Sequence, residues 1–525
     1  MSTEDQNRCV VTLHKGVDTA KFMEEMKKWG YELHDEKPMS ISNFDYVMTR
    51  EQAAELRKDS RVDDVRYGSK EENGIIPIAD AFMKNQEFHK DGNTNGGNWG
   101  FPAMINQSDL WGGSASVINY SPPFTLTGKG VDVVIQDSGI QPDHPEWNDK
   151  PLENTGNIGT TRYQTVDWPT ISGLQSYYTQ SANYHRDLDG HGTHVAGTAC
   201  GKLYGWAKEA NIYSLKILDD PGVAFGVSAS YSMLRAWHNS KKAANQQNDQ
   251  IPIRPTICNM SWSYRSTYEN CVSGVWRGTS WSGTNTDVGN GSLAQYGLIA
   301  GSQDSSGNWT FPVRVASVDS DILDCLNDGI IFVAAAGNRR HRMDLPGGVD
   351  YDNYFNDTNL GQRYYHRGAT PGAYPKVIAV GSIQNDYQGG QERQSFFTNR
   401  GPRVDAYAPG HNIMSAMSQT ASANKAAGQI PYPLDNGYQV NKLSGTSMAS
   451  PQIAGILACL LQIRETYTQD EMRAFVEENG QKGRLYDSGV GVPATDYGYY
   501  YALHGANNLF AMQPFNSNIA FRYGT

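Results

Sequence analysis

The feature that most constrains the fold is a repeated alternation of short apolar runs with segments of helical spacing between residues 131 and 463. The apolar runs, each bounded by turn residues, are VDVVIQD, NIYSLKILDD, TICNMSW, GIIFVAAAG and KVIAVGS. The segments with helical spacing are HGTHVAGTACG, SYSMLRAWHNSKKAANQQ, SVDSDILDCLNDG and SMASPQIAGILACLLQI. Strands that alternate with helices form parallel sheets covered by helices on both faces. The sequence therefore predicts an α/β fold with a doubly wound, mostly parallel sheet.

A smaller pattern precedes this region. Residues 9 to about 68 contain three strand-like segments, CVVTLHKG, ISNFDYVMT and DDVRYG, and two helix-like segments, DTAKFMEEMKKWG and TREQAAELRKDSRV. Thr49 stands where the second helix needs an N-cap. We therefore expect residues 1–68 to form a small α+β domain. Residues 69–95 change from a charged to a Gly- and Asn-rich composition, which predicts a linker.

The rest of the chain divides into two parts by length. Residues 96–485 carry the alternating pattern and are expected to form the main domain. Residues 486–525 are too few for another large domain, and we expect them to be a C-terminal extension on the surface.

Composition narrows the classes of partner. The formal net charge of -11 argues against a nucleic-acid partner, because phosphate binding needs concentrated positive charge. No run of about 18 apolar residues is present, so we expect no membrane span and no membrane partner. The first residues, MSTEDQNRCVVTLHKG, lack the basic and apolar regions of a secretory signal. A cytoplasmic or a virus-particle location fits these observations, and the sequence does not choose between them.

Four short motifs carry groups for nucleophilic catalysis. VVIQDSG contains Asp137, HGTHVAGT begins at His191, VAAAGN ends at Asn338, and SGTSMASP contains Ser447. A serine hydroxyl needs a base to remove its proton, and the pKa of histidine lies near neutrality. A buried carboxylate can orient that histidine, and an amide can donate a hydrogen bond to an oxyanion. Each residue alone has a structural explanation; the four together predict a serine-protease active site.

The position of Ser447 adds an electrostatic argument. Ser447 is followed by MASPQIAGILACLL, which is predicted to be a helix. The main-chain N–H of Ser447 would then lie near a helix N-terminus, which favours a developing negative charge. We therefore expect Ser447 to be the nucleophile.

These motifs resemble those of the subtilisin-like serine proteases, the subtilase superfamily. The resemblance covers roughly residues 96–480 and extends to NWGFPAMI, AYPKVIAVGSI and TNRGPRVDAYAPG. It implies that Asp137, His191 and Ser447 form the catalytic triad, that His191 rather than His194 is the base, and that Asn338 belongs to the oxyanion hole. It also implies a serine endopeptidase that cuts polypeptides through an acyl-enzyme intermediate.

The N-terminal domain resembles the inhibitor-type propeptide of the same family. That resemblance implies a zymogen whose own propeptide occupies the active-site cleft and is cut within roughly residues 68–95. A latent or non-catalytic component of a larger assembly remains the alternative. A carboxyl-type relative is excluded by HGTHVAGT, and a cysteine mechanism by the lack of cysteine at the nucleophile position.

The segment ICNMSWS resembles the edge that pairs with an extended substrate in the family, which would make Ser261, Trp262 and Ser263 substrate-binding residues. Trp262 and Ser263 stand where the family has small residues, and we expect them to narrow the substrate pocket. Two inserts, 264–312 and 339–370, follow segments near the predicted site, and we expect them to shape substrate access rather than the core.

The chemistry of the triad requires no cofactor. Family members often bind a structural calcium ion, and the chain has oxygen ligands on loops at Asp187, Asp189, Asp352, Asn356 and Asp357. No EF-hand spacing is present, and acidic loops are commonly only solvated. Calcium is therefore an open expectation with no assigned ligands.

Overall fold

The structure is a computed structural model of the 525-residue chain. It describes residues 8–33, 42–67, 75–77, 99–105, 126–148, 161–181, 184–218, 224–284, 287–288, 292–299, 303–304, 306–388, 391–489 and 502–512. Most of the predicted linker lies outside these residues.

The N-terminal module, residues 8–67, is a small antiparallel sheet with two helices. The strands are β1 (Arg8–Leu13), β2 (Glu32–Leu33), β3 (Asn43–Val47) and β4 (Val62–Tyr67), in the order β2-β3-β1-β4. The helices are α1 (Thr19–Lys28) and α2 (Arg50–Leu56). The Thr49 side chain accepts from the Gln52 N–H while Gln52 returns a bond to the Thr49 N–H, which forms a capping box. The predicted α+β fold of this segment and its cap are confirmed.

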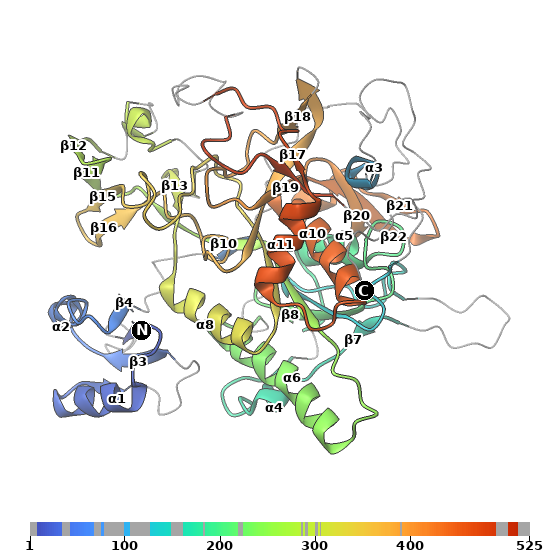
Figure 1. Cartoon of the computed structure of the whole chain (residues 1–525), viewed down its shortest axis with the longest axis horizontal. Coiled ribbons are helices and arrows are strands. Elements are labelled where there is room, and N and C mark those ends of the chain that lie inside the picture. Colours follow the sequence, from blue (N-terminus) through green and yellow to red (C-terminus); the bar gives the residue numbers. More distant parts are fainter. Residues whose placement is uncertain are drawn as a thin grey trace.

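One apolar cluster holds the module together. Phe22 and Met26 of α1 and Ala53 and Leu56 of α2 pack on Val11 of β1. The open face of the module lies beside α8 (Ala316–Asn327) of the larger part of the chain (Figure 1). There the buried Asn43 Nδ2 donates to Ser317 O at 2.7 Å and to Asp321 Oδ1 at 3.0 Å.

The larger part of the chain, here called the body, is built on a ten-stranded sheet. Its order is β23-β24-β19-β17-β14-β9-β6-β8-β7, with β18 paired to β17. All neighbours are parallel except the β17–β18 and β23–β24 pairs. The strands are β6 (Asp132–Asp137), β7 (Tyr163–Gln164), β8 (Asn211–Lys216), β9 (Thr256–Met260), β14 (Ile331–Ala335), β17 (Ile378–Gln388), β18 (Gln391–Gln394), β19 (Ala406–Pro409), β23 (Gln481–Lys482) and β24 (Leu509–Phe510).

Helices cover both faces of this sheet (Figure 1). One face packs against α5 (His191–Cys200), α10 (Thr446–Leu461) and α11 (Gln469–Asn479). The other face packs against α6 (Val227–Gln247) and α8, with the short α4 (Trp168–Ser172) beside α6. Alternate residues of β6 serve the two faces: Val133 and Ile135 lie in the first apolar cluster and Val134 lies in the second. The predicted doubly wound, mostly parallel sheet is confirmed.

The two inserts form a sheet of their own, which the sequence did not indicate. Strands β11 (Cys271–Trp276) and β12 (Thr279–Ser282) of the first insert pair with β15 (Tyr354–Asp357) and β16 (Gly361–Tyr364) of the second. The short η3 (Ala294–Tyr296) lies between these pairs in the sequence. Tyr268, Trp281 and Phe355 lie in the apolar cluster beneath this sheet.

A third, three-stranded sheet joins segments that are far apart in sequence. Its order is β13-β10-β5, formed by β13 (Thr310–Pro312), β10 (Trp262–Thr267) and β5 (Ile75–Pro77). β5 lies within the predicted linker, so part of that segment is a strand paired to the body.

The expected surface extension at the C-terminus is wrong for residues 502–512. Leu503, Leu509 and Phe510 are buried in the first apolar cluster, and β24 adds a parallel strand beside β19. Short segments gain their stability from such packing, which the length of the segment does not reveal. The predicted division of the chain into four parts otherwise stays a prediction.

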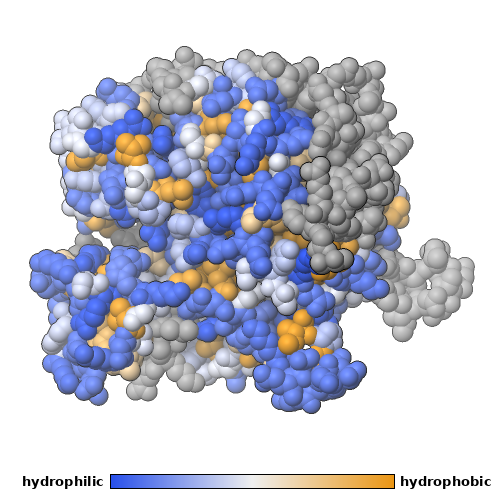
Figure 2. All heavy atoms as spheres, in the orientation of Figure 1, coloured by the Kyte–Doolittle hydropathy of each residue, from blue (hydrophilic) through white to orange (hydrophobic). Residues whose placement is uncertain are grey.

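The remaining elements lie at the periphery of the body. The helix α3 (Gly100–Ile105) contacts β19, and α9 (Ala423–Ala426) contacts β22. A small sheet has the order β20-β22-β21, with β20 (Ile413–Met417), β21 (Ile430–Tyr432) and β22 (Asp435–Leu443). On the face shown in Figure 2, hydrophobic side chains form small patches separated by hydrophilic ones. In the part of the chain that the structure describes, no helix is long and apolar enough to cross a membrane.

Candidate active site

The four predicted catalytic groups meet at one edge of the main sheet. Strands β14, β9 and β6 are neighbours and parallel, so their carboxyl ends lie side by side. Asn338 follows β14, Ser261 follows β9, and Asp137 is the last residue of β6. Helices α5 and α10 begin at this edge with His191 and Thr446. Residues that are distant in sequence thus converge where α/β sheets commonly bind ligands.

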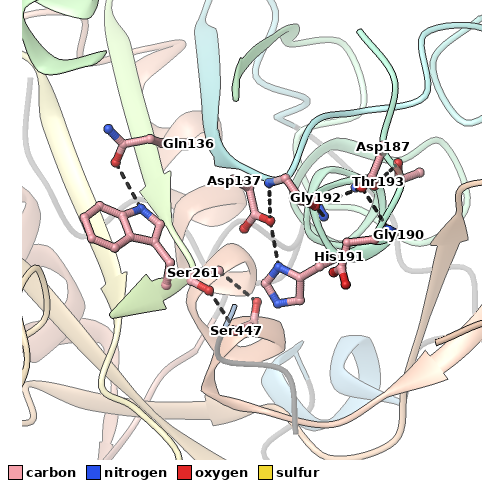
Figure 3. A network of polar contacts seen from close by, with 12 residues as sticks. Gln136, Asp137, Asp187, Gly190, His191, Gly192, Thr193, Ser261 and Ser447 are labelled. Atoms are coloured by element: carbon pink, nitrogen blue, oxygen red, sulfur yellow. Dashed lines mark hydrogen bonds and ion pairs between the residues drawn. The ribbon is translucent and has the colours of Figure 1, made fainter. Parts of the chain in front are cut away.

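Asp137 and His191 form a buried pair. Asp137 Oδ1 accepts from His191 Nδ1 at 2.7 Å and from the Ser138 N–H at 2.7 Å (Figure 3). Both side chains are fully buried. The bond from Nδ1 assigns the imidazole proton to that nitrogen, so Nε2 is left as a proton acceptor. The Asp137 Oδ2 and His191 Nε2 atoms have no hydrogen-bond partner among the described residues.

Asp187 fixes the start of the helix that carries His191. Its Oδ1 accepts from the Gly190 N–H at 2.8 Å and from Ser138 Oγ at 2.9 Å, and its Oδ2 accepts from the Thr193 N–H and Oγ1 at 2.8 and 2.6 Å. These bonds satisfy N–H groups that a helix N-terminus leaves unpaired. Burial raises the pKa of the Asp187 carboxyl above its usual value. With four donors already on its oxygens, Asp187 does not fit the role of a calcium ligand.

Ser447 lies in the first turn of α10 and exchanges two hydrogen bonds with Ser261. Pro451 lacks an N–H, so it cannot donate to Ser447 O as an ordinary helical residue does. Ser261 Oγ takes that place and donates to Ser447 O at 3.0 Å. The Ser447 hydroxyl in turn donates to Ser261 O at 3.1 Å (Figure 3). In this arrangement the hydroxyl proton points to a carbonyl oxygen rather than to His191.

The amide of Asn338 is oriented by Thr446. Asn338 Oδ1 accepts from the Thr446 N–H and from Thr446 Oγ1, both at 2.9 Å. Thr446 Oγ1 also accepts from the Gly337 N–H at 3.0 Å. Because Thr446 binds the carbonyl oxygen of the amide, the Nδ2 donor of Asn338 faces away from Thr446. This orientation suits a donor to an oxyanion on the Ser447 side.

His194 has a structural role. It is fully buried, and its Nε2 lies 2.9 Å from Ile413 O and 3.1 Å from Asn441 O. Burial lowers the pKa of His194 to about 3. His191, and not His194, contacts Asp137.

The segment after Ser261 is the edge on which β5 lies. β10 pairs antiparallel with β5 through Trp262 opposite Pro77, Ser263 opposite Ile76 and Tyr264 opposite Ile75. The main chain of the predicted substrate-binding segment is therefore already paired with a strand of this chain.

The expectation that Trp262 narrows a pocket is wrong. Its indole is fully buried in the apolar cluster under α6, and its Nε1 donates to Gln136 Oε1 at 3.1 Å. Side chains alternate along a strand, and in β10 this alternation turns Trp262 and Tyr264 toward the core. Ser263, on the opposite face of β10, is also buried.

Sequence reasoning missed three residues that support the site. Asp187 was considered only as a metal ligand, and Thr446 and Asn259 were not considered. Asn259 Nδ2 donates to Ser261 Oγ at 2.9 Å, and its Oδ1 accepts from Ser450 Oγ at 2.6 Å. Sequence position could have indicated two of them: Asp187 precedes the start of a predicted helix, and Thr446 adjoins Ser447, the predicted nucleophile.

The other candidate calcium ligands are engaged with protein groups. Asp189 pairs with Lys425, Asp352 with Arg367 at 2.7 Å, and Asn356 Nδ2 donates to Ser273 Oγ. Asp357 Oδ1 accepts two main-chain N–H groups. Across the described ranges, no group of three or more His, Cys, Asp and Glu side chains is placed to hold a metal ion. Calcium therefore stays a prediction without a supporting site.

The chain is similar in sequence to known proteins. The family model for the subtilase family matches residues 128–499. Alkaline serine exoprotease A of Vibrio alginolyticus is 25% identical over 452 residues, which cover 86% of this chain and 57% of that protein. Subtilisin-like proteinase Spm1 of Pyricularia oryzae is 24% identical over 403 residues, which cover 75% of this chain and 53% of that protein. The chain therefore matches little more than half the length of these relatives.

A solved structure is also similar to this chain. The crystal structure of a cold adapted subtilisin-like serine proteinase is 20% identical, covers 79% of this chain and 98% of that chain, and has a TM-score of 0.45. The family match includes β6, β9 and β14, both helices of the site and the four motifs. The chain belongs to the subtilase family.

Proposed function

We propose that this chain is a serine endopeptidase that hydrolyses peptide bonds through Asp137, His191 and Ser447. The observation that carries the proposal is the buried 2.7 Å bond between Asp137 Oδ1 and His191 Nδ1, next to a serine at the start of a helix. A histidine held in this tautomer is ready to accept a proton at Nε2. The match to the subtilase family supports the same chemistry.

The reaction proceeds in two halves. Ser447 Oγ attacks the scissile carbonyl carbon as His191 Nε2 takes the hydroxyl proton, and the carbonyl becomes an oxyanion. Asn338 Nδ2 and the Ser447 N–H donate to that oxyanion. The C–N bond then breaks, and His191 returns the proton to the departing amine. Water, deprotonated by His191, attacks the resulting ester, and Ser447 leaves with its proton restored.

Binding of substrate would also change the partner of Ser447. In the structure its hydroxyl donates to Ser261 O, the carbonyl that precedes β10. A substrate strand paired on β10 brings its own N–H groups to this edge, and these compete for the same acceptor. The Ser447 hydroxyl then turns to His191 Nε2. Substrates are therefore proposed to be polypeptides bound as extended strands.

The N-terminal module is proposed to be an inhibitor cut by the same active site. β5 pairs with the main chain of β10, where a substrate would bind, and the module rests on α8. Ser261 is hydrogen-bonded to Ser447. In the pairing with β10, the chain from Ile75 to Pro77 runs toward Ser261, with Pro77 opposite Trp262. A chain that continues in this register would place the residue after Pro77 opposite Ser261. The peptide bond on the carboxyl side of that residue would then face Ser447. We therefore propose a cut between Ile78 and Ala79, within the segment 68–95.

A second candidate function is a latent component of a larger assembly. It is motivated by the same two observations: β5 covers the edge strand, and the Ser447 hydroxyl is turned from His191. Latency predicts that the module stays attached and that Ser447 is not reactive.

Intact-mass measurement over time separates the two functions. The wild-type chain is expected to lose a piece ending at residue 78 and to react with a fluorophosphonate, whereas Ser447→Ala should do neither. Ser240→Ala, which removes a serine on α6 far from the site, should process as the wild type does. Loss of the same piece from Ser447→Ala would overturn self-cleavage, and an unreactive, uncut wild type would favour latency.

No step of this mechanism uses a cofactor, and we propose that none is required. A chelator should then leave kcat unchanged. A fall in melting temperature on chelation would identify calcium as a structural ion.

A further inference from the structure

Gln136 links two strands that serve different parts of the site. It precedes Asp137 on β6, and strand alternation turns its side chain to the opposite face of the sheet, into the cluster under α6. It is fully buried there among apolar residues. Its Oε1 accepts from Trp262 Nε1 at 3.1 Å (Figure 3). Its Nε2 donates to Ser230 Oγ of α6 at 2.8 Å. One amide thereby joins β6, β10 and α6.

This link begins where the main-chain pairing ends. β6 and β9 pair from Asp132 opposite Thr256 as far as Gln136 opposite Met260. After Met260 the chain leaves the main sheet, and β10 belongs to the separate three-stranded sheet. The direction in which β10 leaves is thus not set by main-chain bonds to β6. The side-chain bond from Trp262 to Gln136 spans this junction.

The bond is well placed to set that direction. Trp262 directly follows Ser261, which contacts Ser447, and its main chain pairs with β5. Moving β10 by one residue would leave two groups in the apolar layer without hydrogen-bond partners. These are the indole Nε1–H of Trp262 and the Oε1 atom of Gln136. Buried polar groups without hydrogen-bond partners are destabilising, so this shift of β10 is disfavoured.

We propose that Gln136 is a positioning residue that fixes the angle at which β10 leaves the sheet, and with it the distance between a paired substrate strand and Ser447. The proposal rests on the proposed peptidase function. Asp137 is unaffected, because β6 is held by β8 and β9 on its two sides. A change at Gln136 should therefore matter for substrates that pair with β10 and not for those that do not.

Two substrates test this distinction in the self-processed chain, with active sites counted by a fluorophosphonate. One is a tetrapeptide p-nitroanilide with the sequence of residues 75–78; the other is p-nitrophenyl acetate, which has no main chain to pair with β10. Gln136→Met removes both amide bonds, and the one to Trp262 is the bond that reaches β10. For this variant, kcat/KM on the tetrapeptide should fall roughly 10-fold, mainly through kcat. Turnover of the acetate should change less than about twofold.

Tyr231→Phe is the matched control. Tyr231 lies next to Ser230 on α6, and its hydroxyl donates to Met260 Sδ at 3.0 Å in the same buried layer, without reaching β10. It should lower the melting temperature as Gln136→Met does but keep the ratio of the two activities. Trp262→Phe should reproduce the changed ratio, and the double variant Gln136→Met/Trp262→Phe should change it no further.

The outcomes are distinct. Equal losses on both substrates, or an unchanged ratio in Gln136→Met, would show that the amide only stabilises the fold and would overturn the proposal. A folded wild type that turns over neither substrate would overturn the peptidase function, and this proposal with it.

Discussion

The N-terminal module and the body differ in the number of apolar clusters that stabilise each of them. The module has one four-stranded sheet and a single apolar cluster, and it contacts α8 of the body, where Asn43 donates two hydrogen bonds. The body has a ten-stranded sheet with a separate apolar cluster on each face. A small domain buries a smaller fraction of its surface and is less stable. The module is therefore expected to be the less stable part of the molecule.

The difference also separates two kinds of chemistry. The groups proposed for catalysis lie in the body, whereas the module contributes the Asn43 contacts to α8. Variants in the body should therefore change turnover without changing how the module binds. Variants in the module should do the reverse.

The largest expected effect is that of Asp137→Asn. An asparagine cannot hold the imidazole in the required tautomer, so turnover should fall by about 10⁴-fold, as measured by kcat per folded molecule. Asp132→Asn is the control, since Asp132 lies at the other end of β6, where it pairs with Lys241 and Arg254. It should lower stability and spare kcat. A kcat loss of similar size in both variants would contradict a catalytic role for Asp137.

Asn338→Ala should reduce kcat by about 100- to 1000-fold, because one oxyanion donor is lost; the best-known case of such a loss is an asparagine in a related subtilisin. KM should change little, and the module should bind the variant as it binds the wild type. Full activity in Asn338→Ala would assign the oxyanion contact to other groups.

Acid should destabilise the body more than the module. Burial lowers the pKa of His194 and His341 to about 3, and that of His238, His366 and His411 to about 4. Between a pKa of about 6.5 in the unfolded chain and these folded values, only the unfolded chain gains the proton, so stability falls as pH falls. His194 alone should cost about 3 kcal/mol at pH 4.5.

Two other groups bear on the size of this acid effect. Burial raises the pKa of Asp319 to about 6, so this carboxyl is protonated more readily in the folded chain and offsets part of the loss. His14, the histidine among the described residues of the module, is exposed. Calorimetry of Ser447→Ala from pH 7 to 4.5 measures the net slope, and His194→Gln should flatten it. An unchanged slope in that variant would show that His194 titrates normally.

Asn43→Ala should raise the dissociation constant between the module and the body roughly 10-fold. The reason is that the Asn43 amide donates two buried hydrogen bonds to α8. The measurement is the fraction of active sites labelled by a fluorophosphonate as the processed chain is diluted. Lys28→Ala, on the exposed side of α1, should have no effect. Unchanged dissociation in Asn43→Ala would place the main docking contacts elsewhere.

The smallest expected effect compares two equivalent helix caps. Thr49 in the module and Thr468 in the body form the same capping box, and removing either hydroxyl should cost about 1 kcal/mol. In the module this is a larger share of the total stability. Thr49→Ala should therefore increase hydrogen exchange throughout the module, whereas Thr468→Ala should increase it only in the first turn of α11. If hydrogen exchange increased over equally many residues in both variants, the module would not be the less stable part of the molecule.

The sheet and the positions of the four motifs could be predicted because both depend on local patterns. Apolar runs ending in Asp137 and in the residues just before Asn338 identify the strands, and parallel strands bring their carboxyl ends together. The Thr49 cap was predictable for the same reason, since its partner lies three residues away.

The rest depends on contacts between distant segments. Strand β11 finds its partner β15 about 80 residues later, and neither segment shows that pairing on its own. The direction of the Trp262 side chain depends on the break between β9 and β10 at Ser261 and on Gln136, which lies on another strand. The family resemblance suggested a pocket there, but only packing places the indole in the core.

The position of β24 has a consequence for synthesis. This strand pairs with β19 in the main sheet, and the Ala511 N–H donates to Tyr407 O at 2.9 Å, yet it is made after every residue of the triad. At roughly 5–20 residues per second, the ribosome needs several seconds to proceed from Ser447 to Phe510. Until then the edge of β19 is open, and an open edge favours pairing with other chains. A stop codon in this interval therefore yields a chain that has all the proposed catalytic residues but lacks the strand β24 of the main sheet.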